Sequence, residues 1–148
     1  MEAARSMLLH SSLPLSFWAE AVSTANYLRN RSPTLALSGK TPYECWYGKK
    51  PVLSNLRIFG CVSYIHIPKE LRKKLDPKSE KCIFLGYPDG TKGYKLYNLN
   101  TLRFTRSQSI FFCENEFHDW NEKVDQKQFN QFFRGNEDND DEDVWEVQ

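Results

Sequence analysis

The sequence predicts an α+β protein in which a helical segment precedes a small antiparallel β-barrel and an acidic tail. Two changes of pattern along the chain carry this prediction. Apolar residues recur at helical spacing early in the chain, whereas short runs rich in Ile, Val, Phe and Tyr, separated by turn residues, begin near residue 56. A later change of charge marks the tail. We place the three regions at residues 1–52, 53–113 and 114–148.

The helical region shows two amphipathic patterns. Residues 1–12 and 16–33 each carry apolar side chains on one helical face, and a Ser-Pro pair ends the second pattern. We expect Trp18, in the second stripe, and Trp46, further along, to pack between elements. Because two short helices rarely bury a sufficient core, this helix pair looks incomplete by itself.

A Gly-Lys-Thr-Pro sequence at residues 39–42 raises the question of a phosphate-binding loop. A P-loop needs another glycine five residues earlier, where Thr34 stands, and it needs a preceding strand rather than helix and loop. A local explanation fits better. Thr41 is a suitable N-cap, Pro42 suits the first helical position, and Glu44 completes a capping box. We therefore interpret the sequence as the start of a short helix.

The barrel region contains four short segments of β-type composition, which we expect to form four or five strands. They are residues 57–68, 81–87, 93–98 and 102–112. Gly60 and Gly86, inside such segments, indicate bulges or sharp bends. The Pro-Asp-Gly sequence at residues 88–90 predicts a turn, and the glycines around it lack the spacing of a phosphate cradle.

The net charge of +1 conceals a strong asymmetry. Residues 1–113 hold 17 Lys and Arg against 7 Asp and Glu, a balance of +10, whereas residues 114–148 hold 3 against 12, a balance of −9. This division indicates a polyanion-binding body followed by a solvated end. We expect a weak helix over residues 114–133 and disorder over residues 135–148.

Metal and membrane signals are weak. None of the cysteines (45, 61, 82 and 113) forms a Cys-x-x-Cys pair or lies at metal-site spacing from a histidine. We expect buried thiols, with a zinc site as the disfavoured alternative. No apolar run approaches membrane-spanning length, and the chain does not start with a signal-peptide pattern. The sequence thus predicts an intracellular protein without a membrane partner.

Several stretches together resemble one family, the integrase region of the pol polyprotein of copia-type LTR retrotransposons. The resemblance extends over residues 1–113, in order and with similar spacing. It is carried by 14-PLSFWAEAVSTANYLRNRSP-33, 39-GKTPYECWYGKKP-51, 56-LRIFGCVSYIHIP-68 and 74-KLDPKSEKCIFLGYPDGTKGYKLYN-98.

The resemblance implies that residues 1–52 are the end of an RNase H-like catalytic core and residues 53–113 an SH3-like barrel. It also implies DNA integration by three carboxylates that hold two divalent metals, Mg or Mn. In the family pattern these carboxylates lie upstream of residue 1, as does a zinc-binding segment. Glu2 falls after the metal-binding glutamate and is not assigned that role. We therefore expect no enzyme activity, no catalytic residue and no cofactor in this chain as it stands.

The remaining expectation is sequence-independent binding of DNA or RNA, in the nucleus where it acts on DNA, with other integrase subunits as further partners. Tyr94 and Tyr97 are candidates for base stacking, although packing in the barrel is the favoured interpretation. The candidate phosphate contacts are Lys69, Arg72, Lys73, Lys74, Lys78, Lys81, Lys92, Lys95, Arg103 and Arg106.

Two other functions stay open at this point. The barrel could be a co-opted protein-interaction module whose acidic tail covers the basic surface. The chain could also be a transposon relic without a selected role. A gain in DNA affinity on removal of residues 114–148 would favour a regulatory tail.

Overall fold

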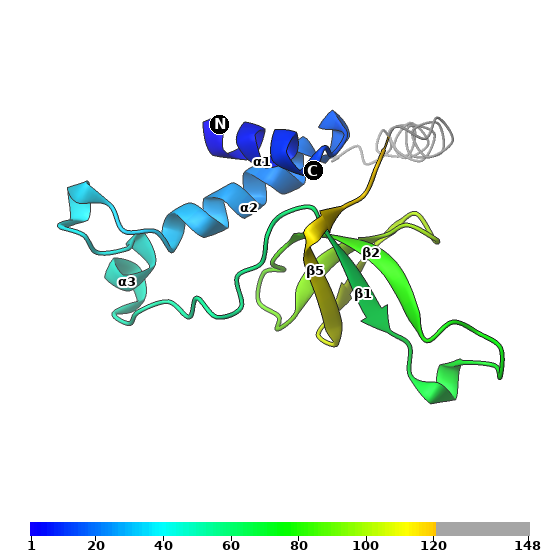
Figure 1. Ribbon diagram of the computed structural model, residues 1–148. Coiled ribbons are helices and arrows are strands. Elements are labelled where there is room, and N and C mark those ends of the chain that lie inside the picture. Colours follow the sequence, from blue (N-terminus) through cyan, green and yellow to red (C-terminus); the bar gives the residue numbers. More distant parts are fainter. Residues whose placement is uncertain (121–148) are drawn as a thin grey trace, which may run out of the picture. The chain divides into compact units, whose positions relative to one another are not determined.

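Three helices occupy the N-terminal part of the computed structural model, which describes residues 1–120 (Figure 1). Helices α1 and α2 are linked by a short 3-10 helix, Leu15–Phe17, and a second 3-10 helix, Leu35–Leu37, precedes α3. All three helices were predicted from the sequence. Their bounds are Glu2–Ser11 for α1, Trp18–Asn30 for α2 and Pro42–Tyr47 for α3.

The start of α3 confirms the capping explanation of the Gly-Lys-Thr-Pro sequence. The Thr41 side chain accepts a hydrogen bond from the Glu44 backbone N–H at 3.0 Å, and Pro42 takes the first helical position. Gly48 ends the helix with a φ of 70°, a left-handed conformation that favours glycine. This sequence therefore caps a helix.

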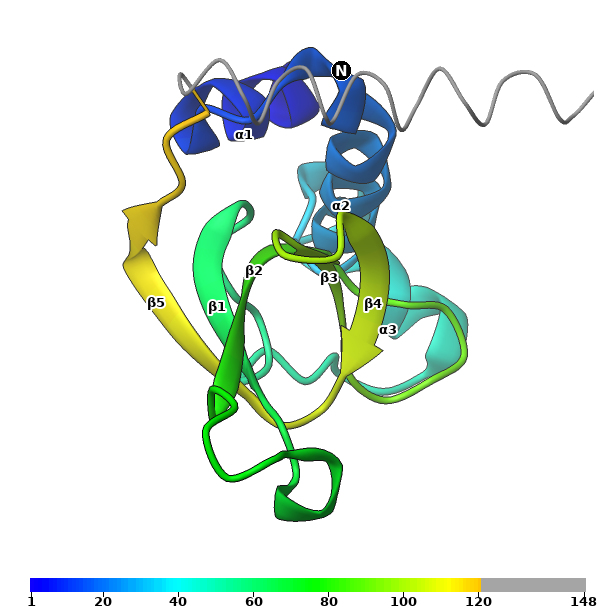
Figure 2. The same ribbon diagram turned by 90° about the vertical axis from the view of Figure 1, so that its right-hand side faces the viewer.

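Five antiparallel strands form one strongly curved sheet (Figure 2). Their order in the sheet is β4-β3-β2-β1-β5. The segment predicted at residues 102–112 is in fact two strands, because the chain bends between residues 107 and 110. The strands are β1 (Cys61–His66), β2 (Ser79–Gly86), β3 (Tyr94–Asn98), β4 (Arg103–Ser107) and β5 (Ile110–Phe117).

One face of the sheet encloses the barrel core. Its buried residues are Cys61, Cys82, Phe84 and Leu96, and partly buried Phe112 is among the apolar side chains packed against them. Phe84 and Phe112 meet edge to face, with ring centroids 5.6 Å apart. Alternation along the strands places these side chains on the same face.

The opposite face of the sheet packs against the helices. Val62, Ile83 and Tyr97 are directly opposite one another in the strand register, and all three are buried. The ring of Phe17, just before α2, meets Tyr97 edge to face at 5.3 Å between centroids. Strand β2 is consequently buried on both faces, which explains its unbroken apolar run from Cys82 to Leu85.

Helix α2 docks onto β2 at the bulge that the sequence predicted around Gly86. The register of β2 with β3 shifts between Phe84 and Gly86. There the Thr24 hydroxyl donates a hydrogen bond to the Leu85 carbonyl at 2.7 Å, and both residues are buried. A Cβ added at Gly86, where φ is 149°, would collide with Thr24 Oγ1. The absence of a side chain at Gly86 therefore permits this close approach.

The end of the sheet corrects one expectation. Strand β5 continues to Phe117, so residues 114–117 are extended, and the weak helix predicted from residue 114 is wrong there. The sheet also runs past the predicted boundary at residue 113. The rest of the predicted tail helix and the acidic run at residues 135–148 lie outside the described residues, apart from residues 118–120.

Candidate nucleic-acid interface

A basic loop between β1 and β2 protrudes from the barrel (Figure 1). We call residues 68–78 the basic hairpin. The Ile67 N–H donates to the Lys78 carbonyl at 3.0 Å, which closes the base of the loop. Inside it, the Asp76 carboxylate accepts the Lys73 N–H at 2.8 Å. The loop therefore contains a defined internal turn.

The basic hairpin contains half of the ten predicted phosphate contacts. Lys69, Lys73, Lys74 and Lys78 are exposed, whereas Arg72 is half-buried. The loop carries these five cations against two acids, Glu70 and Asp76. Since Asp76 is engaged by the backbone, the outward surface of the basic hairpin is mainly cationic.

The other five predicted contacts are spread over the barrel, and only Lys95 and Arg106 are direct neighbours in the strand register. Lys81 is exposed on β2 and Arg103 on the edge strand β4. Lys92 lies in the β2–β3 loop, at the opposite end of β2 from the basic hairpin. For an eight-residue strand, this is a separation of about 25 Å. The ten residues thus do not form one continuous surface.

Lys95 and Arg106 are opposite each other in the register of β3 and β4, on the face of the sheet that packs against the helices. The Lys95 ammonium lies 2.7 Å from Glu20 Oε1 of α2 and 5.0 Å from the centroid of the Phe104 ring. A cation paired in this way is less available to phosphate. Lys95 is better explained as a contact that holds α2 on the barrel.

The two candidate tyrosines pack inside the protein. Tyr97 is fully buried, so it offers no face for base stacking. Tyr94 packs edge to face against Phe112 at 4.9 Å, and its hydroxyl donates to the Asn55 carbonyl at 3.0 Å. This confirms the favoured packing interpretation for both residues.

The two tryptophans correct another expectation. Trp18 has 58% of its surface exposed and Trp46 has 84%, so neither packs between elements as predicted. Helix α2 instead buries Ala21 and Thr24 on the face toward the sheet. The predicted apolar stripe is therefore wider than the buried face of α2. The small residues Ala21 and Thr24 allow the helix to pack closely on the sheet, and Trp18 lies at the edge of this contact.

The cysteines mostly follow the prediction of buried thiols. Cys61 and Cys82 are fully buried, and burial raises the pKa of each thiol to about 12. Cys113 is half-buried, but Cys45 is exposed on α3. Within residues 1–120, no three His, Cys, Asp or Glu side chains are grouped closely enough to hold a metal ion.

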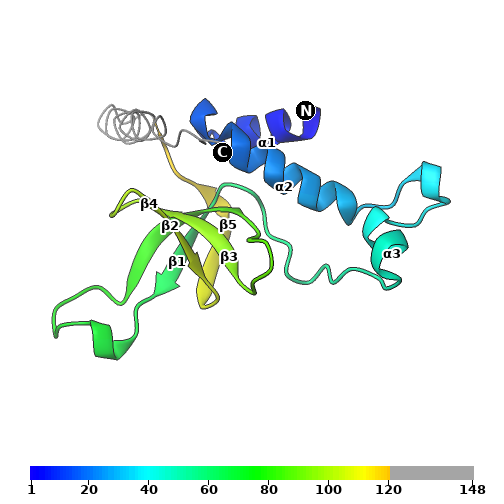
Figure 3. The ribbon, with the colours of Figure 1, turned by 180° about the vertical axis from the view of Figure 1, so that it is seen from behind.

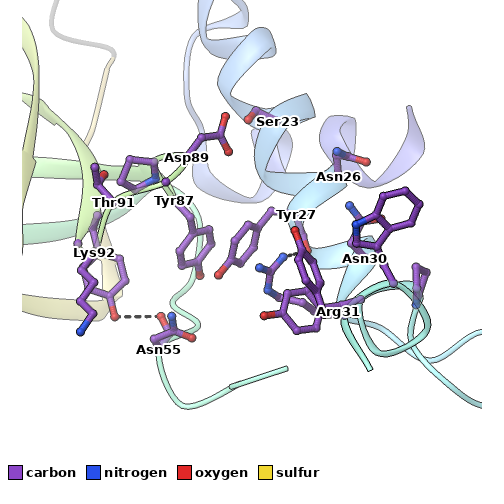
Figure 4. A pocket seen from close by; sticks show the side chains of 18 residues that line it. Ser23, Asn26, Tyr27, Asn30, Arg31, Asn55, Tyr87, Asp89, Thr91 and Lys92 are labelled. Carbon is purple, nitrogen blue, oxygen red and sulfur yellow. Dashed lines mark hydrogen bonds between the residues drawn. The ribbon is translucent and has the colours of Figure 1, made fainter. Parts of the chain in front are cut away.

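A second feature, absent from the sequence prediction, is an open cleft of about 1000 Å³ between the helices and the β2–β3 loop (Figure 4). We call it the aromatic cleft. Figure 3 shows that α3 lies near the C-terminal end of α2 and is joined to the barrel by a long connecting segment. The cleft is lined by Ser23, Asn26, Tyr27 and Asn30 of α2, by Arg31 directly after it, by Pro42, Tyr43, Trp46 and Tyr47 of α3, by Asn55, and by residues 87–94.

The wall of the aromatic cleft is a stack of rings with one cation. The rings of Tyr27 and Tyr87 are parallel, with centroids 4.1 Å apart. On the other side of Tyr27, the Arg31 guanidinium lies 3.4 Å from its centroid and 4.8 Å from that of Tyr43. The Tyr87 hydroxyl accepts the Arg57 N–H at 2.9 Å, and burial raises the pKa of Tyr87 to about 12. Tyr87 is therefore a neutral, fixed part of the wall.

Five short, strongly curved antiparallel strands around one core define a small SH3-like barrel domain. Comparison with known families agrees: the retroviral polymerase SH3-like domain matches residues 61–127. No solved structure matches the chain. Within residues 1–120, none of the helices is both long and apolar enough to cross a membrane.

Comparison with curated proteins extends the match to the helices. The Retrovirus-related Pol polyprotein from transposon TNT 1-94 of Nicotiana tabacum is 46% identical over 84% of this chain. The corresponding protein from transposon RE1 of Arabidopsis thaliana is 37% identical over 79%. An uncharacterized mitochondrial protein of Arabidopsis thaliana is 41% identical over 55% of this chain and 65% of its own length.

The chain is thus similar over most of its length to the retrovirus-related Pol polyproteins of plant transposons. It spans 10% of the length of the tobacco relative and 8% of the RE1 relative. The predicted resemblance to the pol polyprotein is confirmed.

Proposed function

We propose that this chain is the C-terminal part of the integrase region of a Pol polyprotein and that it binds nucleic acid without sequence selectivity. The helices would be the end of an RNase H-like core, and the barrel would carry the principal phosphate-binding surface. The order of helices before an SH3-like barrel supports this assignment, as does the similarity to Pol polyproteins over most of the chain.

The basic hairpin is the observation that carries the proposal. Four exposed lysines lie in one loop, and this loop protrudes from the barrel (Figure 1). Lysine acts as a point charge and contacts phosphates without reading base edges. Binding through this loop is therefore tolerant of sequence and sensitive to salt.

We propose further that this chain alone does not catalyse strand transfer. That reaction requires two divalent metals held rigidly by carboxylates. In the family that the sequence resembles, those carboxylates precede the matching segment. The contribution of the chain to integration would thus be to hold DNA near a catalytic site that the longer polyprotein supplies.

A charge-matched pair of triple variants tests the proposal. Lys73, Lys74 and Lys78 are changed to Ala in one protein, and the control replaces Arg5, Arg29 and Lys40, which are equally exposed on the helical part. Affinity for a fluorescent duplex of about 20 base pairs is measured by anisotropy at low salt.

We expect the basic-hairpin variant to lose affinity on the order of 30-fold, because three phosphate contacts disappear, and the control to lose little. Equal losses in the two variants would show that net charge, and not the basic hairpin, attracts DNA. A wild-type chain that does not bind duplex DNA at low salt would overturn the proposed function.

A further inference from the structure

The aromatic cleft presents two large aromatic side chains to solvent beside a row of amides. Trp46 and Tyr47 of α3 are 84% and 61% exposed, yet both line the cleft. On the α2 side, Asn26 and Asn30 carry side-chain amides along the same opening (Figure 4). A strongly exposed Trp in a concave site is a typical binding feature, since aromatic surface costs free energy when it is hydrated.

The interior of the cleft is preformed. The stack of Tyr87, Tyr27, Arg31 and Tyr43 fixes the ring planes and already places a guanidinium against two of them. A cationic ligand such as a methylated lysine is disfavoured, because Arg31 already occupies the position of a cation over the rings. The cleft can instead accept a flat, uncharged ring that stacks and forms hydrogen bonds with amides.

The charges around the cleft favour an anion. Arg31 and Lys92 line it against a single acid, Asp89. Lys49 and Lys50, both exposed, follow directly after α3. A ligand with uncharged flat rings on an anionic backbone satisfies both properties of the site, and that chemistry is a strand of nucleic acid with unpaired bases.

We propose that the aromatic cleft binds single-stranded nucleic acid, with a base stacked on Trp46 and the adjacent backbone phosphates facing Lys92 and Lys49. Asn26 and Asn30 offer hydrogen-bond donors and acceptors to base edges. This proposal rests on the proposed nucleic-acid binding and adds a second site with a different substrate. Duplex DNA does not enter, because its bases are already paired and stacked.

Two tryptophans provide a matched test. Trp46→Ala removes the exposed ring in the cleft, and Trp18→Ala removes an exposed ring at the start of α2, outside the cleft lining. Affinities of the full chain for a labelled oligothymidylate of about 12 nucleotides and for a duplex of the same length are compared by anisotropy.

We expect Trp46→Ala to weaken single-strand binding at least fivefold, the lower limit for loss of one stacked base, and to leave duplex binding unchanged. Trp18→Ala should change neither affinity. A charge reversal, Lys92→Glu, provides an independent variant of an exposed residue and should also weaken single-strand binding selectively.

Intrinsic fluorescence supplies a second readout. Stacking of a base on Trp46 should quench part of the tryptophan emission, and Trp46→Phe should abolish that part while Trp18→Phe preserves it. Unchanged single-strand affinity in Trp46→Ala and Lys92→Glu, with duplex binding intact, would overturn the cleft proposal alone. Loss of all binding in the wild type would instead overturn the proposed function itself. Binding of an acidic peptide but of no oligonucleotide would assign the cleft to a protein partner.

Discussion

The basic hairpin and the aromatic cleft lie at opposite ends of β2 and are built in different ways. The basic hairpin is continuous in sequence, and its Lys73–Asp76 turn needs little from the rest of the protein. The cleft combines Arg31 at the C-terminal end of α2, Trp46 of α3 and Tyr87 of the barrel, and therefore exists only when α2 is docked on the sheet. The comparison teaches that charge-based binding can be local, whereas a stacking site depends on tertiary structure.

A combined variant should give the largest effect on binding. Changing Lys73, Lys74, Lys78 and Trp46 to Ala together should reduce duplex affinity about 30-fold, as the basic-hairpin variant does, and single-strand affinity at least fivefold, as Trp46→Ala does, since distant sites are energetically independent. Anisotropy with the labelled duplex and with the labelled oligothymidylate measures the two losses. A duplex loss clearly larger than that of the basic-hairpin variant would mean that the two regions form one site.

Gly86→Ala should break the cleft and spare the basic hairpin. The new methyl group collides with Thr24 Oγ1 at a backbone φ of 149°, so we expect a loss of about 2–3 kcal/mol in the free energy of unfolding. Urea denaturation measures it. Gly90→Ala is the control: φ there is 66°, but the space around it is open, so only backbone strain of about 1 kcal/mol applies. Equal losses in the two variants would contradict the proposed role of Gly86 in docking α2.

Thr24→Val should have a smaller effect of the same kind. The substitution keeps the shape of the side chain but removes the hydrogen bond to the buried Leu85 carbonyl, at a cost of about 1–2 kcal/mol. Single-strand affinity should fall with it, while duplex affinity at a temperature where the protein is folded should not. A stable Thr24→Val variant with unaltered cleft binding would show that α2 is held by packing alone.

Thiol labelling should perturb the protein least, and it should distinguish the exposed helix α3, which carries part of the cleft, from the buried core of the barrel. Exposed Cys45, on the helix that carries Trp46, should react with a thiol reagent at the rate of an unfolded peptide, whereas Cys61 and Cys82 in the barrel should react only on unfolding. Mass spectrometry of the labelled chain identifies the sites. Rapid labelling of Cys82 would contradict the rigid barrel core.

The same thiols predict a pH dependence. Because burial raises the pKa of Cys61 and Cys82 to about 12, their protonated forms stabilise the folded state fully below pH 9. As pH rises from 9 towards 12, the unfolded chain loses these protons first, so the stability of the barrel should fall. Replacement of both residues by Ala should reduce this fall.

The sequence predicted the parts of the structure that depend on neighbouring residues. The Thr41 cap, the turn with Gly90 and the cationic loop all follow from local chemistry and were found as expected. The division of residues 102–112 into two strands was not predicted, because Gln108 and Ser109 lack the glycine or proline that usually marks a turn.

The cleft could not be predicted from the sequence for a different reason. A helix of six residues is too short for periodicity to tell which side is buried, so Trp46 was assigned to packing when it is exposed. The partners Tyr27 and Tyr87 are far apart in the chain and meet only through the docking of Thr24 at the Gly86 bulge. The sequence did indicate part of this surface, since Lys92, predicted as a phosphate contact, lines the cleft.

The salt dependence of duplex binding tests the central claim most directly. With four exposed lysines of the basic hairpin on phosphates, the logarithm of the binding constant should fall against the logarithm of salt concentration with a slope of about −3 to −4. The variant without Lys73, Lys74 and Lys78 should lose most of that slope. A slope near zero for the wild type, or no detectable binding to duplex DNA at low salt, would contradict the account.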